Sequence, residues 1–273
     1  MALTNKDSNK IDNLELSIQI SLSGLSFCVL NKDSKTIEAL KAFHFDRKLN
    51  PFEVVDYLKQ LFETETTLNN TFSNVCIIHD NDLSTLVPKV LFDDDYLADY
   101  LKFNSKILKS DFITYDAIVI NNSVNVYVPY ININNYIYDK FGAFTFKHVS
   151  TILIESILEQ QKNTNDNKLY VNVSENHYEI ICIENSKLQL YNSFEYNTKE
   201  DFIYFILFTA EQLKLNTETL NLVFIGNISK DDALYSIAYK YIRDISFGNR
   251  NDTYKYNHAP QSNYSNFTLL KSI

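Results

Sequence analysis

The sequence predicts an α/β protein made of two tandem copies of one structural unit. Each copy consists of a β-hairpin, a third strand, a helix and a buried strand, and this order occurs twice within 273 residues. Alternating apolar and polar residues indicate the hairpin strands, continuous apolar runs the buried strands, and apolar residues at helical spacing the helices. At about 100–200 residues per domain, the chain is long enough for both copies.

The first copy covers residues 14–78. Its strands are expected at residues 14–20, 25–30, 36–45 and 75–78. A helix is expected to begin at Asn50, because Pro51 suits the first helical position and Glu53 can complete a capping box. The last strand, Val-Cys-Ile-Ile, is apolar throughout, as is typical of a parallel strand buried on both faces.

The second copy covers residues 169–225. Its strands are expected at residues 169–173, 178–183, 188–194 and 220–225. Thr198 can cap the helix that follows the third strand, with Asp201 three residues later. Few residues are identical between the copies, so the prediction of a repeat depends on the order of elements.

Further elements lie between and after the copies. Helices are expected from residues 93–95 onward and over residues 132–141, 151–162 and 230–246. Residues 267–270 are expected to form a final strand that returns to the sheet. Residues 163–167, Asn-Thr-Asn-Asp-Asn, contain no apolar side chain and are expected to join the two halves. We therefore expect a disordered tail at residues 1–13, a first subdomain at 14–163 and a second at 168–273, with a mobile loop at 248–266.

Composition excludes several classes of protein. The net charge is -9 and no basic run exceeds two residues, which argues against nucleic-acid binding through phosphate contacts. No apolar stretch reaches about 18 residues, so neither a membrane span nor a membrane partner is expected. The polar N-terminus lacks the apolar core of a signal peptide. The three cysteines lie in apolar runs, as buried thiols do, and we expect a cytoplasmic protein.

Glycine is scarce. The four glycines, Gly24, Gly142, Gly226 and Gly248, cannot form either GxGxxG or GxxxxGK[ST]. The sequence therefore contains no recognised glycine-rich phosphate loop.

The repeated order of elements resembles a known fold family. Three antiparallel strands followed by alternating helices and strands, present twice, resemble the pair of ribonuclease-H-like subdomains of the actin-like ATPase superfamily, which includes sugar kinases, actin and heat-shock chaperones. Residues 85–92, 96–103, 239–243 and 267–270 are similar to an uncharacterised bacterial family of this fold, one of the domains of unknown function. The resemblance covers residues 14–273.

The resemblance implies where a nucleotide would bind. In active members the hairpin turn after the first strand of each half cradles phosphates, an Asp at the end of that strand positions a metal, and glycines allow close backbone approach. The residues at the equivalent positions are Ser21, Ser23, Gly24, Ser174, Asn176, Gly226 and Asn227. Both carboxylates and most of the glycines are absent, so ATP hydrolysis is not expected. We assign no catalytic residue and no metal ligand, and we expect no cofactor.

Other polar groups have two interpretations each. Asp80 and Asp82 follow a buried strand at the edge where α/β sheets bind ligands, which makes them candidate site residues. The alternative is that they only form a polar turn after the strand. His177 faces the expected cleft or is an exposed loop residue, and we favour the second. Residues 93–95, three aspartates, are expected to cap a helix rather than bind a cation.

Further histidines and tyrosines complete the set of candidates. His44 and His148 are expected to be packing residues. A dense group of tyrosines suggests an exposed aromatic patch for a partner, consisting of Tyr127, Tyr130, Tyr136 and Tyr138.

Three functions remain open. The first is a binding or scaffold protein that has lost the ATPase residues and works through a protein partner or a small ligand; in it, Leu22, His177 or Tyr178 would fill the cleft. The second is a divergent nucleotide-binding enzyme, an ATPase or kinase-like protein, in which Asp80 or Asp82 supplies the missing carboxylate. This enzyme would bind ATP and Mg²⁺ in an open, polar cleft. The third, a nuclease, needs clustered acidic residues on the first and buried strands, where only Glu15 is present. We favour the first.

Overall fold

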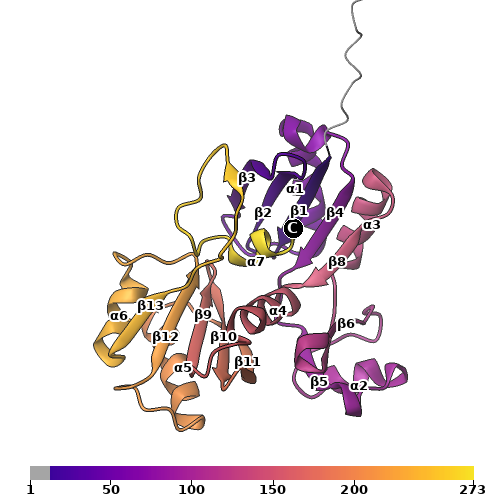
Figure 1. Ribbon diagram of the computed structural model, residues 1–273. Coiled ribbons are helices and arrows are strands. Elements are labelled where there is room, and N and C mark those ends of the chain that lie inside the picture. The colour runs from indigo at the N-terminus through magenta and orange to yellow at the C-terminus, as the bar shows by residue number, and fades with distance from the viewer. Residues whose placement is uncertain (1–12) are drawn as a thin grey trace, which may run out of the picture.

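Two sheets of the same topology form the two lobes of the protein. A computed structural model describes residues 13–273 (Figure 1). In the first lobe the strand order is β14-β3-β2-β1-β4-β8, and in the second it is β11-β10-β9-β12-β13. In each lobe three antiparallel strands are followed by two strands parallel to the first of them. This arrangement confirms the predicted repeat.

The first lobe contains the strands β1 (Leu14–Ile20), β2 (Gly24–Asn31), β3 (Thr36–His44), β4 (Asn74–His79), β8 (Thr145–His148) and β14 (Lys255–Tyr256). Helices α1 (Pro51–Thr64) and α3 (Ile131–Phe141) pack together on one face of its sheet. The predicted capping box is present, because the Asn50 side chain accepts from the backbone N–H of Glu53 and the Glu53 side chain accepts from that of Asn50.

The second lobe contains the strands β9 (Lys168–Val173), β10 (His177–Glu184), β11 (Lys187–Glu195), β12 (Asn221–Gly226) and β13 (Asp244–Phe247). Helices α5 (Lys199–Gln212) and α6 (Ala233–Tyr241) cover one face of this sheet. Thr198 and Asp201 form the second predicted capping box. The helix expected over residues 230–246 is shorter than predicted, because residues 244–247 instead pair with β12 as a parallel strand.

Helix α4 (Val149–Gln161) lies between the lobes (Figure 1). Val149 and Ile152 contact the first sheet, whereas Leu153 and Ile157 pack against the second. Apolar side chains on all faces are typical of a helix that is buried on several sides. Helix α4 therefore contributes to one apolar cluster with each lobe.

The C-terminal segment crosses back from the second lobe to the first (Figure 1, yellow). Residues 267–270 were predicted to form a strand; they are a helix, α7 (Phe267–Lys271), which contacts α4, β1, β2 and β12. Strand β14 pairs with β3, so the segment after residue 248 contributes to both lobes. Arg250, which is 2% exposed, holds the predicted mobile loop by donating to the carbonyl oxygens of Ser262 and Ser265.

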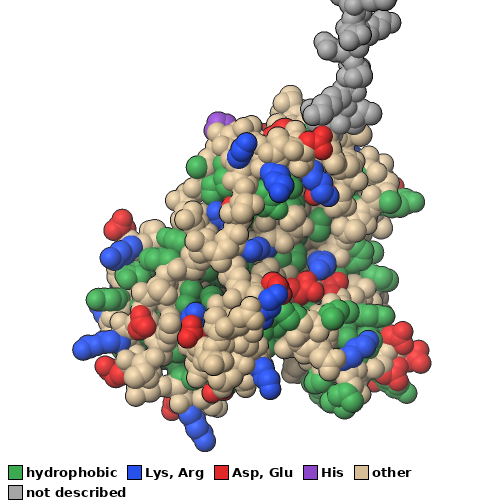
Figure 2. Space-filling view, viewed as in Figure 1, with side chains coloured by type: hydrophobic (Ala, Val, Ile, Leu, Met, Phe, Trp, Pro, Cys, Tyr) green, Lys and Arg blue, Asp and Glu red, His purple; other side chains and the backbone are tan. Residues whose placement is uncertain are grey.

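Residues 83–128 form a third unit, here called the small subdomain. It contains β5 (Ser84–Pro88), α2 (Leu97–Leu101), β6 (Thr114–Ile118) and β7 (Ser123–Tyr127), with the strand order β5-β7-β6. The Asp93 side chain accepts from the backbone N–H of Asp95 at the start of the short 3-10 turn before α2, as predicted for a cap. Many of the apolar side chains of this subdomain are exposed, beside acidic ones (Figure 2).

The predicted tyrosine patch does not exist. Tyr127 and Tyr130 are buried, Tyr136 packs partly into the core of the first lobe, and only Tyr138 is well exposed. Within residues 13–273, nine of the sixteen exposed large hydrophobic side chains belong instead to the small subdomain. These are Val90, Leu91, Tyr96, Phe103, Leu108, Phe112, Tyr115, Val119 and Ile120.

Two other predictions concern the ends and the thiols. The predicted tail at residues 1–13 lies outside the described residues except for Asn13, whose carbonyl accepts from the backbone N–H of Lys32.

Cys28, Cys76 and Cys182 are buried free thiols, as predicted. Across residues 13–273, every helix is too short or too polar to cross a bilayer.

Candidate functional site

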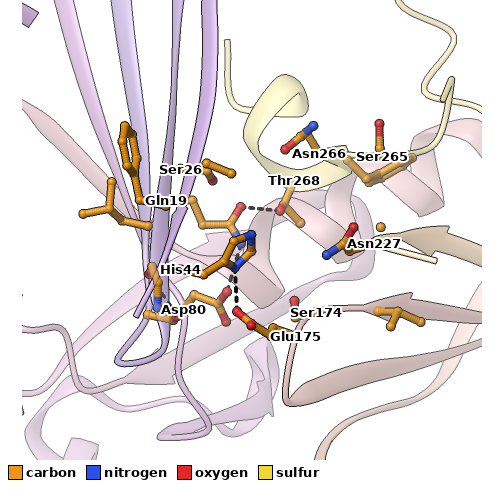
Figure 3. A pocket seen from close by; sticks show the side chains of 18 of the residues that line it. Gln19, Ser26, His44, Asp80, Ser174, Glu175, Asn227, Ser265, Asn266 and Thr268 are labelled. Atoms are coloured by element: carbon orange, nitrogen blue, oxygen red, sulfur yellow. Dashed lines mark hydrogen bonds and ion pairs between the residues drawn. The ribbon is translucent and has the colours of Figure 1, made fainter. Parts of the chain in front are cut away.

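A polar pocket of about 360 Å³ lies between the two lobes (Figure 3). The two hairpin turns line it, together with the ends of β4 and β12 and part of the C-terminal segment. All seven residues that the resemblance assigned to a cofactor lie in its wall: Ser21, Ser23, Gly24, Ser174, Asn176, Gly226 and Asn227. The volume is in the range of small-molecule sites, roughly 300–1,000 Å³. Their position in the wall does not test whether they bind a cofactor, so the expectation of no cofactor stays a prediction.

The same backbone hydrogen bonds build both halves of the pocket. The N–H of Ser21 donates to the carbonyl of Gly24, and that of Ser174 donates to the carbonyl of His177, both at 2.9 Å. The carboxyl ends of parallel strands meet at one edge of a sheet, so residues 80 and 227, which follow β4 and β12, lie beside these turns.

Two glycines are required by close backbone contacts. A Cβ at position 226 would lie 2.4 Å from the carbonyl oxygen of Val173, and Gly226 has a φ of +83°. A Cβ on Gly24 would lie 2.6 Å from the carbonyl oxygen of Phe43. Both positions therefore need glycine for packing alone.

The amides of the first turn are already engaged. The Ser21 hydroxyl accepts from the backbone N–H groups of Ser23 and Gly24, at 3.2 and 3.1 Å. The two turns also bond to each other, because the Asn176 side-chain amide donates to the Ser23 hydroxyl at 2.6 Å. A phosphate in this position would have to replace these contacts.

Asp80 is buried at the end of β4, with 5% of its surface exposed. One carboxylate oxygen, Oδ2, accepts from Nε2 of Gln19 at 2.9 Å, and the other, Oδ1, lies 3.0 Å from Nε2 of His177. The Thr268 hydroxyl of α7 in turn donates to Oε1 of Gln19 at 2.6 Å (Figure 3). Asp80 therefore joins the first lobe, the second lobe and the C-terminal helix.

His177 lies between two carboxylates. Its Nε2 is 3.4 Å from Oε1 of Glu179, as well as 3.0 Å from Asp80. Only 15% of its side chain is exposed, so the prediction of an exposed loop histidine was wrong. The reason is local: His177 is the first residue of β10, and the strand directs its ring toward the first lobe.

The charges of this cluster depend on one another. Burial alone would lower the pKa of His177, but Asp80 and Glu179 raise the pKa well above its usual value. Burial alone would raise the pKa of Asp80, but the His177 charge and the hydrogen bonds from His177 and Gln19 lower it. The imidazole is therefore protonated and the Asp80 carboxyl is ionised at neutral pH.

Ion pairs also cross the mouth of the pocket. Nδ1 of His44 lies 2.5 Å from the Glu175 carboxylate, and both side chains are more than half exposed. His44 is therefore not the packing residue that we predicted. Near the same edge, the Lys48 ammonium lies 2.7 Å from the Glu195 carboxylate. Exposed pairs of this kind contribute little stability.

His148 and His79 are buried packing residues. His148 was predicted to be a packing residue, and the structure confirms this. Nδ1 of His148 bonds to the Ser150 hydroxyl at 2.7 Å. Burial lowers the pKa of the His148 ring to about 4. Nε2 of His79 bonds to the Asn134 side chain at 2.9 Å, and burial lowers its pKa to about 3. Both rings are neutral at pH 7.

The pocket offers little positive charge to a phosphate. Among the residues that the structure describes, Lys41 is the one lysine or arginine in the wall, and its ammonium lies 2.5 Å from the Glu65 carboxylate. Asp80 and Glu175 contribute negative charge. Asp82 is exposed and does not line the pocket, so it cannot supply the carboxylate of a nucleotide site.

Comparison with known proteins assigns the family. The model of a family described as "Protein of unknown function (DUF3822)" matches residues 4–245. The chain belongs to the DUF3822 family. A search of curated proteins found no match. These findings confirm the expected membership of an uncharacterised family.

Solved structures confirm the actin-like fold of this DUF3822 chain. A Bacteroides thetaiotaomicron protein, described as having an actin-like ATPase fold and unknown function, is 26% identical, with a TM-score of 0.78; the match covers 89% of this chain and 93% of that one. A chain of the PilM–PilN type IV pilus biogenesis complex is 9% identical, with a TM-score of 0.57, and covers 89% and 90%.

Several site residues of this DUF3822 chain were not identified from the sequence. Glu179 is one, although its spacing from His177 places both side chains on the same face of β10. Asn172 pairs directly with Glu179 in the sheet and donates to its Oε2 at 2.9 Å. Gln19 takes the equivalent place in the first lobe, one residue before the end of β1.

Proposed function

We propose that the chain is a binding protein of actin-like fold that does not hydrolyse nucleotides. The observation that carries this proposal is the pairing of the pocket carboxylates. Asp80 and Glu175 are the carboxylates in the pocket wall; Asp80 is held by Gln19 and His177, and Glu175 by His44. To hold a hydrated Mg²⁺ ion or to orient a water molecule, either carboxylate would have to give up these partners.

The chemistry of phosphoryl transfer explains why this pairing matters. Catalysis requires Mg²⁺ on the phosphates, donors around the transferred group and a positioned nucleophile. Mg²⁺ is usually bound through one or two carboxylates together with substrate phosphates. Here the cationic partner of Asp80 is His177, and the turn amides bond to Ser21. The arrangement favours retention of a small polar ligand over turnover of ATP.

The exposed apolar surface of the small subdomain supports a protein partner. Exposed apolar side chains that gather in one part of a protein are typical of interaction sites. The PilM–PilN structure, a relative by fold alone, is itself a complex of two proteins. A scaffold role is thus compatible with the fold.

The three buried free thiols support a reducing compartment. Disulfides are rare where glutathione and thioredoxin keep thiols reduced, and none of the three cysteines is paired. We therefore place the protein in the cytoplasm as part of this proposal.

Calorimetric titration with ATP, with and without Mg²⁺, followed by a phosphate-release assay, tests the proposal. We expect no turnover above the rate without protein, and no difference between the wild-type chain and the Asp80→Asn variant. Turnover that requires Mg²⁺ and is lost in Asp80→Asn would overturn it.

One observation favours the alternative, a divergent nucleotide-binding enzyme. The pocket is open, because Leu22 packs against the core of the first lobe and Tyr178 is fully buried in that of the second. Of the three side chains that could have filled the cleft, only His177 reaches it. The phosphate-release assay above separates the two functions.

A further inference from the structure

We propose that Asp80, His177 and Glu179 form a binding site for a divalent transition metal of the zinc class. The site lies between the lobes, with Asp80 from the first lobe and the other two residues from β10 of the second. One ligand atom from each residue lies within 4.8 Å of the other two. The proposal goes beyond the binding function above and does not depend on it.

The spacing of the three atoms fits one metal ion. Nε2 of His177 lies 3.0 Å from Oδ1 of Asp80 and 3.4 Å from Oε1 of Glu179. Zinc binds nitrogen and oxygen at about 2.0–2.2 Å with tetrahedral geometry, so two ligands of one ion are roughly 3.3 Å apart. Both distances from His177 match this value, and the two carboxylate oxygens lie within 4.8 Å of each other.

Each of the three side chains is oriented through its other polar atom. Oδ2 of Asp80 accepts from Gln19 at 2.9 Å, and Oε2 of Glu179 accepts from Asn172 at the same distance. Nδ1 of His177 lies 3.1 Å from Oδ1 of Asn176. A second shell of this kind holds metal ligands in place in proteins and fixes the histidine tautomer.

Asn176 determines which ring nitrogen can bind a metal. Its Nδ2 donates to the Ser23 hydroxyl at 2.6 Å, so its Oδ1 faces the His177 ring and accepts from Nδ1–H. When a metal ion displaces the Nε2 proton, the lone pair is therefore on Nε2, which faces Asp80 and Glu179. The tautomer is the one that a metal requires.

Charge balance favours a divalent ion. Asp80 and Glu179 are 5% and 1% exposed, and within residues 13–273 neither forms an ion pair with a lysine or an arginine. A metal ion on Nε2 takes the place of the proton that His177 carries in the metal-free site. Two buried carboxylates around the resulting neutral imidazole carry two negative charges, which a divalent cation balances. Burying such charges without compensation is costly.

The ligand set selects the metal class. One imidazole nitrogen and two carboxylate oxygens suit zinc and its neighbours, whereas Mg²⁺ and Ca²⁺ prefer six or more oxygens. Asp80 and His177 line the pocket, so the fourth position of a tetrahedral ion would be reached from it. A water molecule or an anionic group of a small ligand would occupy that position.

Titration of the chelator-treated full chain with Co²⁺ tests the site without any substitution. We expect one Co²⁺ per chain, with the intense visible absorption of four-coordinate cobalt, and displacement of Co²⁺ by one equivalent of Zn²⁺. A wild-type chain that binds neither ion, or that gives only the weak absorption of octahedral cobalt, would overturn the proposal.

Variants assign the ligands. His177→Gln and Glu179→Gln should weaken Zn²⁺ binding by more than about 100-fold, and Asn172→Ala, which removes a second-shell contact, by about 10- to 100-fold. His44→Gln is the matched control, because His44 is also paired with a glutamate at this pocket. Equal affinities in wild type and in a folded His177→Gln chain would contradict the assignment. If circular dichroism shows that a variant is unfolded, the cobalt spectrum of the wild-type chain alone decides whether the metal site exists.

Discussion

Asp80 and Asn227 occupy equivalent positions in the two lobes. The backbone N–H of Asp80 donates to the carbonyl of Ile20 at 2.9 Å, and that of Asn227 donates to the carbonyl of Val173 at 2.7 Å. Ile20 and Val173 are the last residues of β1 and β9. The same backbone hydrogen bond is thus present in both lobes, although the residues differ. Of the two equivalent residues, Asp80 carries a carboxylate, and this carboxylate forms the ion pair with His177.

Asp80→Asn should destabilise the protein. The substitution removes the charge that faces His177 inside the protein, and breaking a buried pair costs about 3–5 kcal/mol. Urea denaturation at neutral pH measures the change. Asp82→Asn is the control, because Asp82 is exposed and should change the free energy of unfolding by less than about 0.5 kcal/mol. Equal effects of the two substitutions would show that the pair is not a stabilising contact.

Gly226→Ala should cost more stability than Gly142→Ala. Both glycines have positive φ, +83° and +76°. An added Cβ would meet the Val173 carbonyl at 2.4 Å in the first case and nothing within 4 Å in the second. We expect about 1–3 kcal/mol from the strained backbone at position 142, where φ is 76° and ψ is -130°, and a larger loss at 226. Thermal unfolding of both variants measures the difference, and similar melting temperatures would mean that the close contact is relieved by a small shift.

His148 should make the fold less stable in mild acid. Its pKa is about 4 in the folded protein, against 6.5 for an exposed histidine. Between these values the unfolded chain binds a proton that the folded chain does not, so stability is complete above pH 6.5 and falls as the pH approaches 4. The loss is on the order of 3 kcal/mol.

Comparison with His148→Gln isolates this effect from other titrating groups. Urea denaturation between pH 7 and 4 should show a smaller loss of stability in the variant than in the wild-type chain. If the free energy of unfolding falls equally with pH in the wild-type chain and in the variant, protonation of His148 does not destabilise the folded protein.

The small subdomain allows a test of its exposed apolar surface. Phe103 is 82% exposed, so Phe103→Ser should change the free energy of unfolding by less than about 0.5 kcal/mol while lowering the binding of a hydrophobic fluorescent dye. Val126 is fully buried in the same subdomain, and Val126→Ser should cost several kcal/mol. Strong destabilisation by Phe103→Ser would show that this side chain packs in solution and is not available to a partner.

The repeat could be predicted because it depends on local patterns. Strand alternation and the capping residues Asn50 and Thr198 are properties of short segments, and the structure reproduces both caps. Residues 267–270 were mistaken for a strand because a short apolar run fits either a buried strand or a buried helix. Strand β14 has two residues, too few for a periodicity to be seen.

The site was only partly predictable. The hairpin turns were located from the order of strands, but the contact between Asp80 and His177 joins residues 97 positions apart. One local signal was available: His177 and Glu179 alternate with the buried Tyr178 and Ile180, which places two titratable side chains on one face of β10. What lies opposite that face depends on the packing of the lobes, which no local pattern encodes.

Helix α4 determines how the pocket can exchange its contents. Because α4 packs against both sheets and α7 contacts β1, β2 and β12, separating the lobes would expose apolar side chains of both helices to water. A small molecule bound in the pocket would therefore enter and leave through the mouth, past His44 and Glu175, while the walls stay in place. The rate of exchange should then depend on the salt concentration, which screens this exposed pair, and little on the viscosity that slows large domain motions.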